Sequence, residues 1–193
     1  MSGHVRVVLL RHGQTEWSRA GRHTGRSDVP LDEGGRRDAR TAGAAVGGVE
    51  FTRVLVSPLL RARETAELAG LRGPVELCDD LMEWDYGEYE GRTTAEIRAD
   101  RPGWTIWNGG VIGGETLEEV GRRADRVVAR LRELEGDVAV VAHGHMLRVL
   151  AARWCGLEPE VARSLSLLPA TISRLGYEHG TPTITLWNSR CAE

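Results

Sequence analysis

Two arginines and two histidines stand directly after, or shortly beyond, three apolar segments of the chain. Arg11 and His12 follow the first segment, Arg61 lies a few residues beyond the second, and His143 follows the third. A guanidinium group binds phosphate through a planar fork of N–H donors, and an imidazole can donate a hydrogen bond or act as a nucleophile. Because the turns that hold these residues contain no carboxylate, the pattern predicts a site for a multiply charged anion, and phosphate is the natural candidate.

These side chains meet only if the three apolar segments are strands of one sheet. The continuous apolar runs predict buried strands at 5–10, 53–57 and 137–142, and weaker patterns predict strands at 75–78, 172–177 and 183–187. Helical patterns lie between them, at 32–46, 58–70, 116–135 and 145–155, with a short helix after 93. The alternation predicts an α/β fold with a mostly parallel sheet covered on both faces. Ligands of such folds bind outside the carboxyl ends of the strands, where the free N–H groups of the helix after His143 would add to an anion site.

Several helix starts carry local capping signals. Ser57 and Pro58 are expected as the N-cap and the first residue of their helix. Further signals are Asp32 as an N-cap and two capping boxes, Thr93 with Glu96 and Thr116 with Glu119. The segment 104–114 contains four glycines and no periodicity, so it is expected to be irregular.

The charged residues limit the chemistry. All 25 basic residues are arginines, which excludes a Schiff-base lysine and the lysine of a nucleotide-binding P-loop. Hydrophobic residues make up 41% and charged residues 27% of the 193 residues, a balance typical of a globular protein. The net charge of −3 gives no general attraction to nucleic acid or to anionic membranes, so neither is expected as a partner.

The cysteines indicate a reducing compartment. The three cysteines, Cys78, Cys155 and Cys191, form no CxxC pair, so a disulfide framework and a zinc site are not expected. The apolar run 5–10 is interrupted by Arg6 and is too short for a signal peptide or a membrane span. These features predict a cytoplasmic protein.

Five segments, in order along the chain, resemble one known family. They are LLRHGQTEW at 9–17, SPLLRARETA at 57–66, EWDYGEYEG at 83–91, GGET at 113–116 and VVAHGHMLR at 140–148. Together they resemble the histidine phosphatase superfamily, which includes the cofactor-dependent phosphoglycerate mutases. The resemblance extends over nearly the whole chain and implies a single histidine phosphatase domain over 1–193, with a three-layer α/β/α fold like that of phosphoglycerate mutase.

The resemblance also implies a mechanism that needs neither metal nor cofactor. His12 would attack phosphorus through its ε nitrogen, which requires a neutral ring, and the neighbouring cations disfavour its charged form. Arg11, Arg61 and a protonatable His143 would hold the phosphate oxygens. Glu83 would protonate the leaving oxygen and later deprotonate the attacking water. A phosphate dianion beside Glu83 would favour its protonated form, so higher activity is expected at mildly acid than at alkaline pH.

Other residues are assigned by their positions in the family's segments. Asp85 is the alternative to Glu83 as the acid. The residues expected to bind substrate or phosphate are Ser18, Thr24, Gly25, Tyr86, Gly144 and His145. His23 and His179 lack such context and are expected at the surface. Three tryptophans are candidates for the pocket wall: Trp84, Trp104 and Trp107. Trp84, Tyr86 and Trp107 would suit an apolar or ring-bearing leaving group.

Three functions are open on the sequence. The mutases that the chain resembles are longer, have more basic residues between the acid and the long helix, and have a lysine where this chain has Thr94. Fewer cations favour a phosphatase that hydrolyses small phosphate monoesters, with a phosphoglycerate mutase as the alternative. A catalytically silent module that binds phosphorylated ligands is disfavoured, because all five catalytic positions are intact. The late strands offer an edge through which a homodimer could form.

Overall fold

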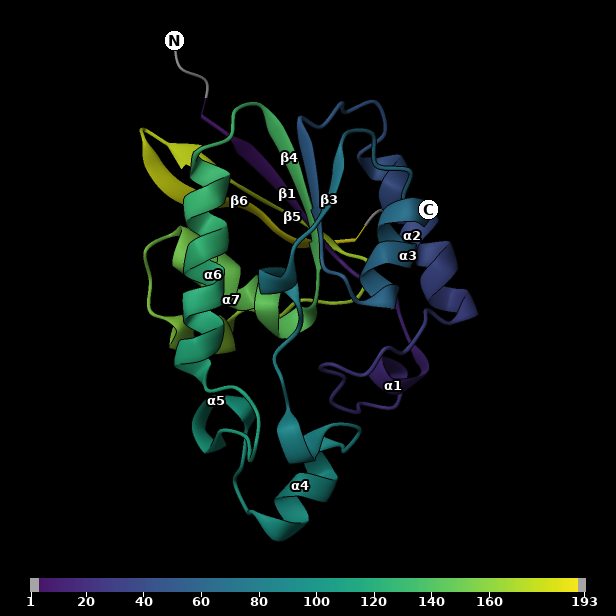
Figure 1. Cartoon of the computed structure of the whole chain (residues 1–193), viewed down its shortest axis with the longest axis vertical. Helices are drawn as coiled ribbons and strands as arrows, with labels where there is room; N and C mark the ends of the chain where they lie inside the picture. Colours follow the sequence, from purple (N-terminus) through teal and green to yellow (C-terminus); the bar gives the residue numbers. More distant parts are fainter. Residues whose placement is uncertain (1–3, 191–193) are drawn as a thin grey trace.

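The computed structural model describes residues 4–190, which form a six-stranded sheet and the helices around it (Figure 1). The strands are β1 (Arg6–Arg11), β2 (Arg53–Val56), β3 (Val75–Leu77), β4 (Asp137–Ala142), β5 (Ile172–Glu178) and β6 (Thr181–Ser189). Their order across the sheet is β3-β2-β4-β1-β5-β6. The four strands from β3 to β1 pair in parallel, whereas β5 and β6 pair antiparallel. The sheet is therefore mixed, with the predicted parallel part at the strands that lead to the site.

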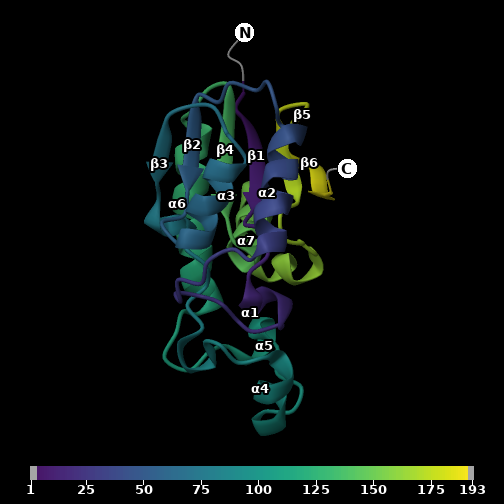
Figure 2. The ribbon, with the colours of Figure 1, turned by 90° about the vertical axis from the view of Figure 1, so that its right-hand side faces the viewer.

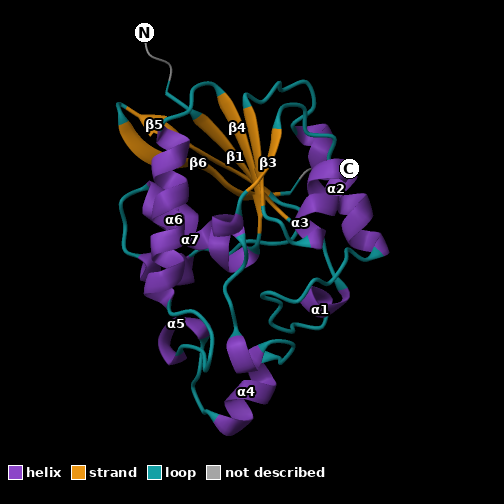
Figure 3. Cartoon of the chain, viewed as in Figure 1, coloured by secondary structure: helices purple, strands orange, loops and turns teal. Residues whose placement is uncertain are grey.

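The helices cover both faces of the sheet and give the expected three layers. Figure 3 shows α6 (Leu117–Arg132) and α7 (Gly144–Trp154) on one side, and α2 (Glu33–Ala45) and α3 (Leu60–Leu68) on the other. In β1, Leu9 packs into the core beneath α6 and α7, and Leu10 packs into the core beneath α2 and α3. Each side chain is nearly inaccessible to solvent. Burial on both faces explains why this strand is apolar without alternation.

The remaining short helices gather at one end of the molecule. They are α1 (Glu16–Arg19), α4 (Thr94–Asp100) and α5 (Ile106–Gly109). Figures 1 and 2 both show them at the end opposite the described N-terminus, below the edge where β1 and its parallel neighbours finish. Further single turns of 3₁₀ helix lie at Asp79–Leu81, Gly87–Tyr89 and Pro159–Ser164. The connecting segments thus cover the carboxyl edge of the parallel strands, where ligands bind in this kind of fold.

Most capping predictions are confirmed. Asp32 caps α2 by accepting a hydrogen bond from the amide of Gly35, and both predicted capping boxes are present at α4 and α6. The segment 104–114 is not wholly irregular, because Thr105 and Asn108 form a third capping box that begins α5. The helix α6 ends at Arg132, three residues earlier than expected.

The predicted start of α3 is wrong. The helix begins at Leu60 with Leu59 as N-cap, and no side chain of the N-cap residue bonds to it. The amide of Leu60 instead donates to the carboxylate of Asp28, 2.6 Å away on a distant loop. Ser57 and Pro58 precede the helix, and the hydroxyl of Ser57 is engaged with a histidine of the site. A polar residue before a helix has the same local pattern whether it caps the helix or faces a ligand site.

Two of the three cysteines can be placed. Cys78 and Cys155 are free thiols, and Cys191 lies outside the described residues. Among residues 4–190, no helix is both long and apolar enough to cross a membrane.

Candidate active site

A pocket of about 200 Å³ lies at the carboxyl edge of the parallel strands. It brings together residues that are far apart in the chain: Arg11, His12, Ser18, Gly21, Arg22, His23, Thr24, Glu83, Tyr86, Gly144, His145, Arg148 and Leu167. Eight of the eleven residues predicted for the site line this pocket. The other three, Arg61, His143 and Gly25, are not on its surface and support residues that are.

His12 is held as a neutral imidazole. It follows β1 and is almost fully buried. Its Nδ1 lies 2.7 Å from the carbonyl oxygen of Gly13, and because a carbonyl can only accept, the proton is on Nδ1. The backbone carbonyl expected to fix the tautomer is therefore that of the next residue. Burial, and then the charges of Arg61 and Arg11, hold the pKa of His12 well below its usual value. Nε2 is left as a basic nitrogen with an available lone pair.

His143 stands beside His12 with a ring-centroid separation of 5.1 Å. Its Nδ1 accepts a hydrogen bond of 3.2 Å from Nε of Arg61. The proton must then lie on Nε2, which donates to the hydroxyl of Ser57 at 2.7 Å. Burial, and then Arg61 and His12, hold the pKa of His143 well below its usual value. A protonatable His143 was expected, whereas the structure favours a neutral ring whose two nitrogens are both engaged.

Arg61 is fully buried and binds the loop above the pocket. Its terminal nitrogens donate to the carbonyl oxygens of Thr24, Gly25 and Ser27 at 2.8 to 3.0 Å. With the bond to His143, these contacts use four of the five N–H groups of the guanidinium. Arg61 therefore orders the loop and the second histidine from a buried position behind the pocket.

Arg11 has donor capacity to spare. One terminal nitrogen donates to the carbonyl oxygen of Leu167. Its Nε is one of three buried side-chain nitrogen or oxygen atoms in residues 4–190 that have no hydrogen-bond partner. A buried unpaired donor costs free energy unless a ligand or water satisfies it. A side chain at position 144 would press on the guanidinium, because a Cβ at Gly144 would lie 3.1 Å from the Cζ of Arg11.

Glu83 lies in the same pocket and is oriented by backbone amides. One carboxylate oxygen accepts from the amides of Trp84 and Met146, both at 2.9 Å, and the other accepts from the amide of His145 at 3.1 Å. The amides of His145 and Met146 belong to the first turn of α7. The expectation that this helix start would bind the anion is therefore wrong for these amides, which hold the carboxylate.

Asp85, the alternative acid, is placed elsewhere. It does not line the pocket, and its carboxylate accepts from the amide of Gly87 and faces Arg26 at 3.9 Å. The geometry therefore favours Glu83 over Asp85 as the group that reaches a ligand.

Two of the predicted phosphate contacts are engaged within the protein. The hydroxyl of Ser18 accepts from the amide of Thr15 and donates to its carbonyl in the capping box of α1. The amide of Gly25 donates to the carboxylate of Glu90 at 2.8 Å. A Cβ at Gly25 would lie 2.5 Å from the carbonyl oxygen of Trp84, so this glycine is required for close packing of the loop.

The aromatic side of the pocket differs from the expectation. The hydroxyl of Tyr86 and Nδ1 of His145 are 2.6 Å apart. His23, expected at the surface, lines the pocket and packs with its ring centroid 4.9 Å from that of Tyr86. Burial lowers the pKa of His23, and burial followed by the charge of Arg148 holds that of His145 well below its usual value.

The tryptophans do not form the pocket wall. Trp84 and Trp104 are buried, and their indole N–H groups donate to the carbonyls of Glu115 and Gly110. Trp107 lies beneath Arg148, whose guanidinium carbon is 4.6 Å from the ring centroid. None of the three tryptophans lines the pocket, so they give no support to the interpretation of a site for a ring-bearing leaving group.

Sequence reasoning missed two arginines of the pocket, Arg22 and Arg148. Arg148 follows His145 by three residues on α7, a spacing that places both on one helix face, so the helical pattern could have identified it. Arg22 has no such signal, because it stands on a loop.

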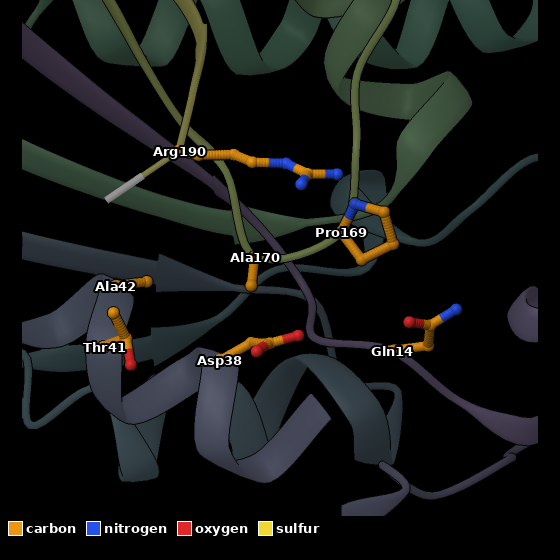
Figure 4. A pocket seen from close by; sticks show the side chains of 7 residues that line it. All are labelled: Gln14, Asp38, Thr41, Ala42, Pro169, Ala170 and Arg190. Atoms are coloured by element: carbon orange, nitrogen blue, oxygen red, sulfur yellow. The ribbon is translucent and has the colours of Figure 1, made fainter. Parts of the chain in front are cut away.

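A second and larger cavity of about 460 Å³ lies away from this chemistry (Figure 4). Its charged residues are Asp38 on α2 and Arg190 after β6, and Figure 4 shows them on opposite sides of the cavity. None of the predicted catalytic residues lines it. The candidate site is therefore not the larger cavity, and it is selected by the arrangement of side chains around His12.

The chain is similar to known proteins over most of its length. Residues 7–190 match the model of the histidine phosphatase superfamily, branch 1. The chain is 42% identical over 179 residues to a protein of Mycobacterium tuberculosis named acid phosphatase, covering 91% of this chain and 88% of that one. It is 39% identical over 187 residues to the sedoheptulose 1,7-bisphosphatase of Saccharomyces cerevisiae, covering 79% of this chain and 68% of the relative.

Solved structures show the same fold. A Mycobacterium tuberculosis open reading frame product superposes with a TM-score of 0.90 at 38% identity, over 97% of this chain and 98% of that one. A mycobacterial glucosyl-3-phosphoglycerate phosphatase in complex with VO3 superposes with a TM-score of 0.83 at 30% identity, over 95% and 98% of the two chains. The chain belongs to the histidine phosphatase superfamily, branch 1.

Proposed function

We propose that this protein is a metal-independent phosphatase that hydrolyses small phosphate monoesters through a phosphohistidine intermediate on His12. The observation that carries the proposal is the fixed tautomer of His12, with Nδ1–H on the carbonyl of Gly13, in a pocket that also holds Glu83 and the unpaired Nε of Arg11. Relatives named as phosphatases support the reaction class.

In the first step, the lone pair of His12 Nε2 attacks phosphorus, and the bond between phosphorus and the ester oxygen breaks. Glu83 gives its proton to the leaving oxygen, so an alcohol departs rather than an alkoxide. Proton transfer of this kind contributes about 10² to 10⁴ in rate. The products of the step are the free alcohol, phosphorylated His12 and ionised Glu83.

In the second step, water attacks the phosphorus of phosphohistidine while ionised Glu83 accepts a proton from it. The bond between phosphorus and Nε2 breaks, which returns His12 to its neutral form and releases inorganic phosphate. Glu83 is again protonated and ready for the next substrate. The ionised state of the cycle matches the three amide hydrogen bonds that the carboxylate accepts.

The positive charge of the site offsets the charge of the transferring phosphoryl group. Arg11 contributes its free Nε–H, and Arg61 contributes positive charge from a buried position behind the pocket. His143 acts in this proposal mainly by fixing Arg61 and the tautomer of its own ring. The amides of His145 and Met146 are bonded to Glu83, so the donors to a ligand come from the side chains of the pocket, Arg11 first among them.

A phosphoglycerate mutase is the second candidate, because relatives at 30% identity are named probable phosphoglycerate mutase. The position where mutases of the family carry a lysine is Thr94 here, whose hydroxyl lies 3.3 Å from Nε2 of His23. A neutral hydroxyl attracts a second anionic group less than an ammonium would. This difference favours hydrolysis.

Three further parts of the proposal concern the whole protein. The extent of the family match over 7–190 supports a single domain. The free thiols of Cys78 and Cys155 are consistent with a cytoplasmic location. The β6 edge is available for the homodimer considered from the sequence.

The test is release of phosphate from p-nitrophenyl phosphate in excess EDTA at mildly acid pH. Wild type is expected to be active, His12→Ala inactive, and His179→Asn unaffected. The last variant is a matched control, since His179 is exposed and its positive φ of 49° suits asparagine. Interconversion of phosphoglycerate isomers upon addition of bisphosphoglycerate, without phosphate release, would favour the mutase. Activity retained in His12→Ala would contradict the mechanism.

A further inference from the structure

We propose that Arg123 and Glu115, which do not line the pocket, are positioning residues that set the location of Glu83 for proton transfer to the leaving group. The proposal rests on the function of Glu83 proposed above. It gives a role in catalysis to a buried ion pair between Arg123 on α6 and Glu115, which lies just before that helix.

Arg123 holds the chain on the N-terminal side of Glu83. It is largely buried on α6, and NH1 donates to the carbonyls of Asp80 and Met82, both at 2.8 Å. NH2 makes a longer contact of 3.4 Å to the carbonyl of Glu83 itself. One guanidinium thus contacts three carbonyls of the segment that ends at the acid.

Glu115 holds the chain on the C-terminal side of Glu83. Its carboxylate accepts from the amide of Asp85 at 3.0 Å, and its carbonyl accepts from the indole N–H of Trp84 at 2.7 Å. The amide of Glu115 donates to the carbonyl of Asp85 at 3.0 Å. The two residues directly after the acid are therefore fixed to the turn that precedes α6.

A bidentate ion pair between Arg123 and Glu115 joins the contacts on the two sides of Glu83. We call this ion pair, with those contacts, the clamp. Nε and NH2 of Arg123 donate to the two carboxylate oxygens of Glu115 at 2.7 and 2.8 Å. This fork geometry is specific to arginine, and a lysine cannot reproduce it. Arg26 adds a third contact to the same carboxylate at 3.2 Å.

The clamp and helix α7 act on different parts of Glu83. The clamp fixes the backbone on either side, and the amides of His145 and Met146 fix the carboxylate. Loss of the clamp would let the backbone shift while the helix start still attracts the carboxylate. A displacement of about 1 Å can cost roughly 10²-fold in rate, and here the loss should fall on proton transfer.

A defect in proton transfer has a kinetic signature that general misfolding lacks. A good leaving group such as p-nitrophenolate departs without a proton, whereas an alkoxide requires one. The variants Arg123→Lys and Glu115→Gln should therefore lose about 10- to 100-fold in kcat/KM for alkyl phosphates and much less for p-nitrophenyl phosphate. The ratio kcat/KM is used because it reports the steps up to phosphorylation of the enzyme.

The experiment measures kcat/KM for a series of aryl and alkyl monophosphates of increasing leaving-group pKa. Glu83→Gln is the reference, and Arg126→Met is the matched control. Arg126 lies on the same helix and pairs with Asp80, but through an exposed ion pair with the side chain, so its slope should equal that of wild type. The double variant Arg123→Met/Glu115→Gln leaves no unpaired partner of this ion pair, and it replaces Arg123→Lys if that variant does not fold.

A steeper dependence on leaving-group pKa in the clamp variants, parallel to that of Glu83→Gln, supports the proposal. An equal loss for every substrate would mean that the ion pair only supports the fold, and would overturn it. If Glu83→Gln itself shows the wild-type slope, the assignment of the acid fails, and the positioning role falls with it. The reference variant thus separates a failure of the clamp from a failure of the proposed function.

Discussion

Replacing Ser57 with alanine should remove the buried hydrogen bond between Ser57 and His143. Both residues are inaccessible to solvent, and 2.7 Å separates the hydroxyl from Nε2 of the ring. Nε2 carries the proton because Nδ1 accepts from Arg61. Ser57→Ala leaves that N–H without an acceptor in a buried place, which costs about 1–3 kcal/mol of the free energy of unfolding.

The same substitution should reduce activity, since the ring of His143 would lose one of the two bonds that fix it and Arg61 would lose a fixed acceptor. We expect kcat/KM to fall by roughly tenfold, less than the roughly 10²-fold that a displacement of about 1 Å can cost, because the bond to Arg61 still holds the ring. Urea unfolding and steady-state kinetics on p-nitrophenyl phosphate measure the two effects. Thr105→Ala, which removes the N-cap of α5, is the control and should cost about 0.5–2 kcal/mol with little change in kcat/KM.

A double-mutant cycle with His143→Ala decides between the contact and a simple capping role for Ser57. If the hydroxyl acts through His143, the two substitutions should be non-additive by about 0.5–3 kcal/mol. Additive losses of stability, with kcat/KM unchanged in Ser57→Ala, would refute the reasoning, because the effect of a capping serine would not depend on the histidine.

Two further predictions concern stability. The pKa values of His12, His143 and His145 are held well below 6.5, first by burial and then by neighbouring charges, so below pH 6.5 the unfolded chain binds protons that the folded protein does not. The free energy of unfolding should be level above about pH 6.5. At lower pH it should decrease by up to about 1.4 kcal/mol per pH unit for each histidine. Urea titrations from pH 8 to pH 5 measure this, and a stability that rises on acidification would contradict the assigned neutral rings. Gly13→Ala would place a Cβ 2.4 Å from a backbone carbonyl oxygen of α2 and should cost about 1–3 kcal/mol. Gly121→Ala, in α6, would place a Cβ at ordinary contact distances of 3.5 and 3.6 Å from the ring of Pro159 and should instead stabilise by about 0.5–1 kcal/mol. Equal effects of the two substitutions would argue against the close approach at Gly13.

The sequence predicted features that depend on local pattern. The strands β1 and β4 are continuous apolar runs because both faces of the sheet are covered, and the capping boxes at α4 and α6 are complete within four residues. The catalytic candidates of the pocket were also found, because each directly follows a strand or lies in a recognisable segment.

The errors arise where a residue has two partners open to it and the choice depends on the fold. Ser57 could cap the next helix or bond to a histidine 86 positions away, and only the parallel pairing of β2 with β4 makes the second partner available. The first amides of α7 could bind an anion or a carboxylate, and the path of the chain at Glu83 decides in favour of the carboxylate.

Loop residues were the least predictable part of the site. His23 and Arg22 reach the pocket because two side chains hold the neighbouring loop. Arg61 donates to carbonyls of this loop, and the carboxylate of Glu90 accepts from its amides. These contacts join residues more than thirty positions apart, so no periodic pattern encodes them. His23 was accordingly assigned to the surface.

The most direct test of the central claim is to trap the phosphoryl group on the enzyme. Glu83→Gln mixed with p-nitrophenyl phosphate should form the intermediate, since this leaving group departs without a proton, and should break it down slowly, since no base activates water. Rapid quenching at alkaline pH followed by mass spectrometry of the peptides should find one phosphoryl group on His12, and none in the double variant Glu83→Gln/His12→Ala. A phosphoryl group on another residue, or turnover of the substrate with no labelled enzyme at any time, would contradict the account.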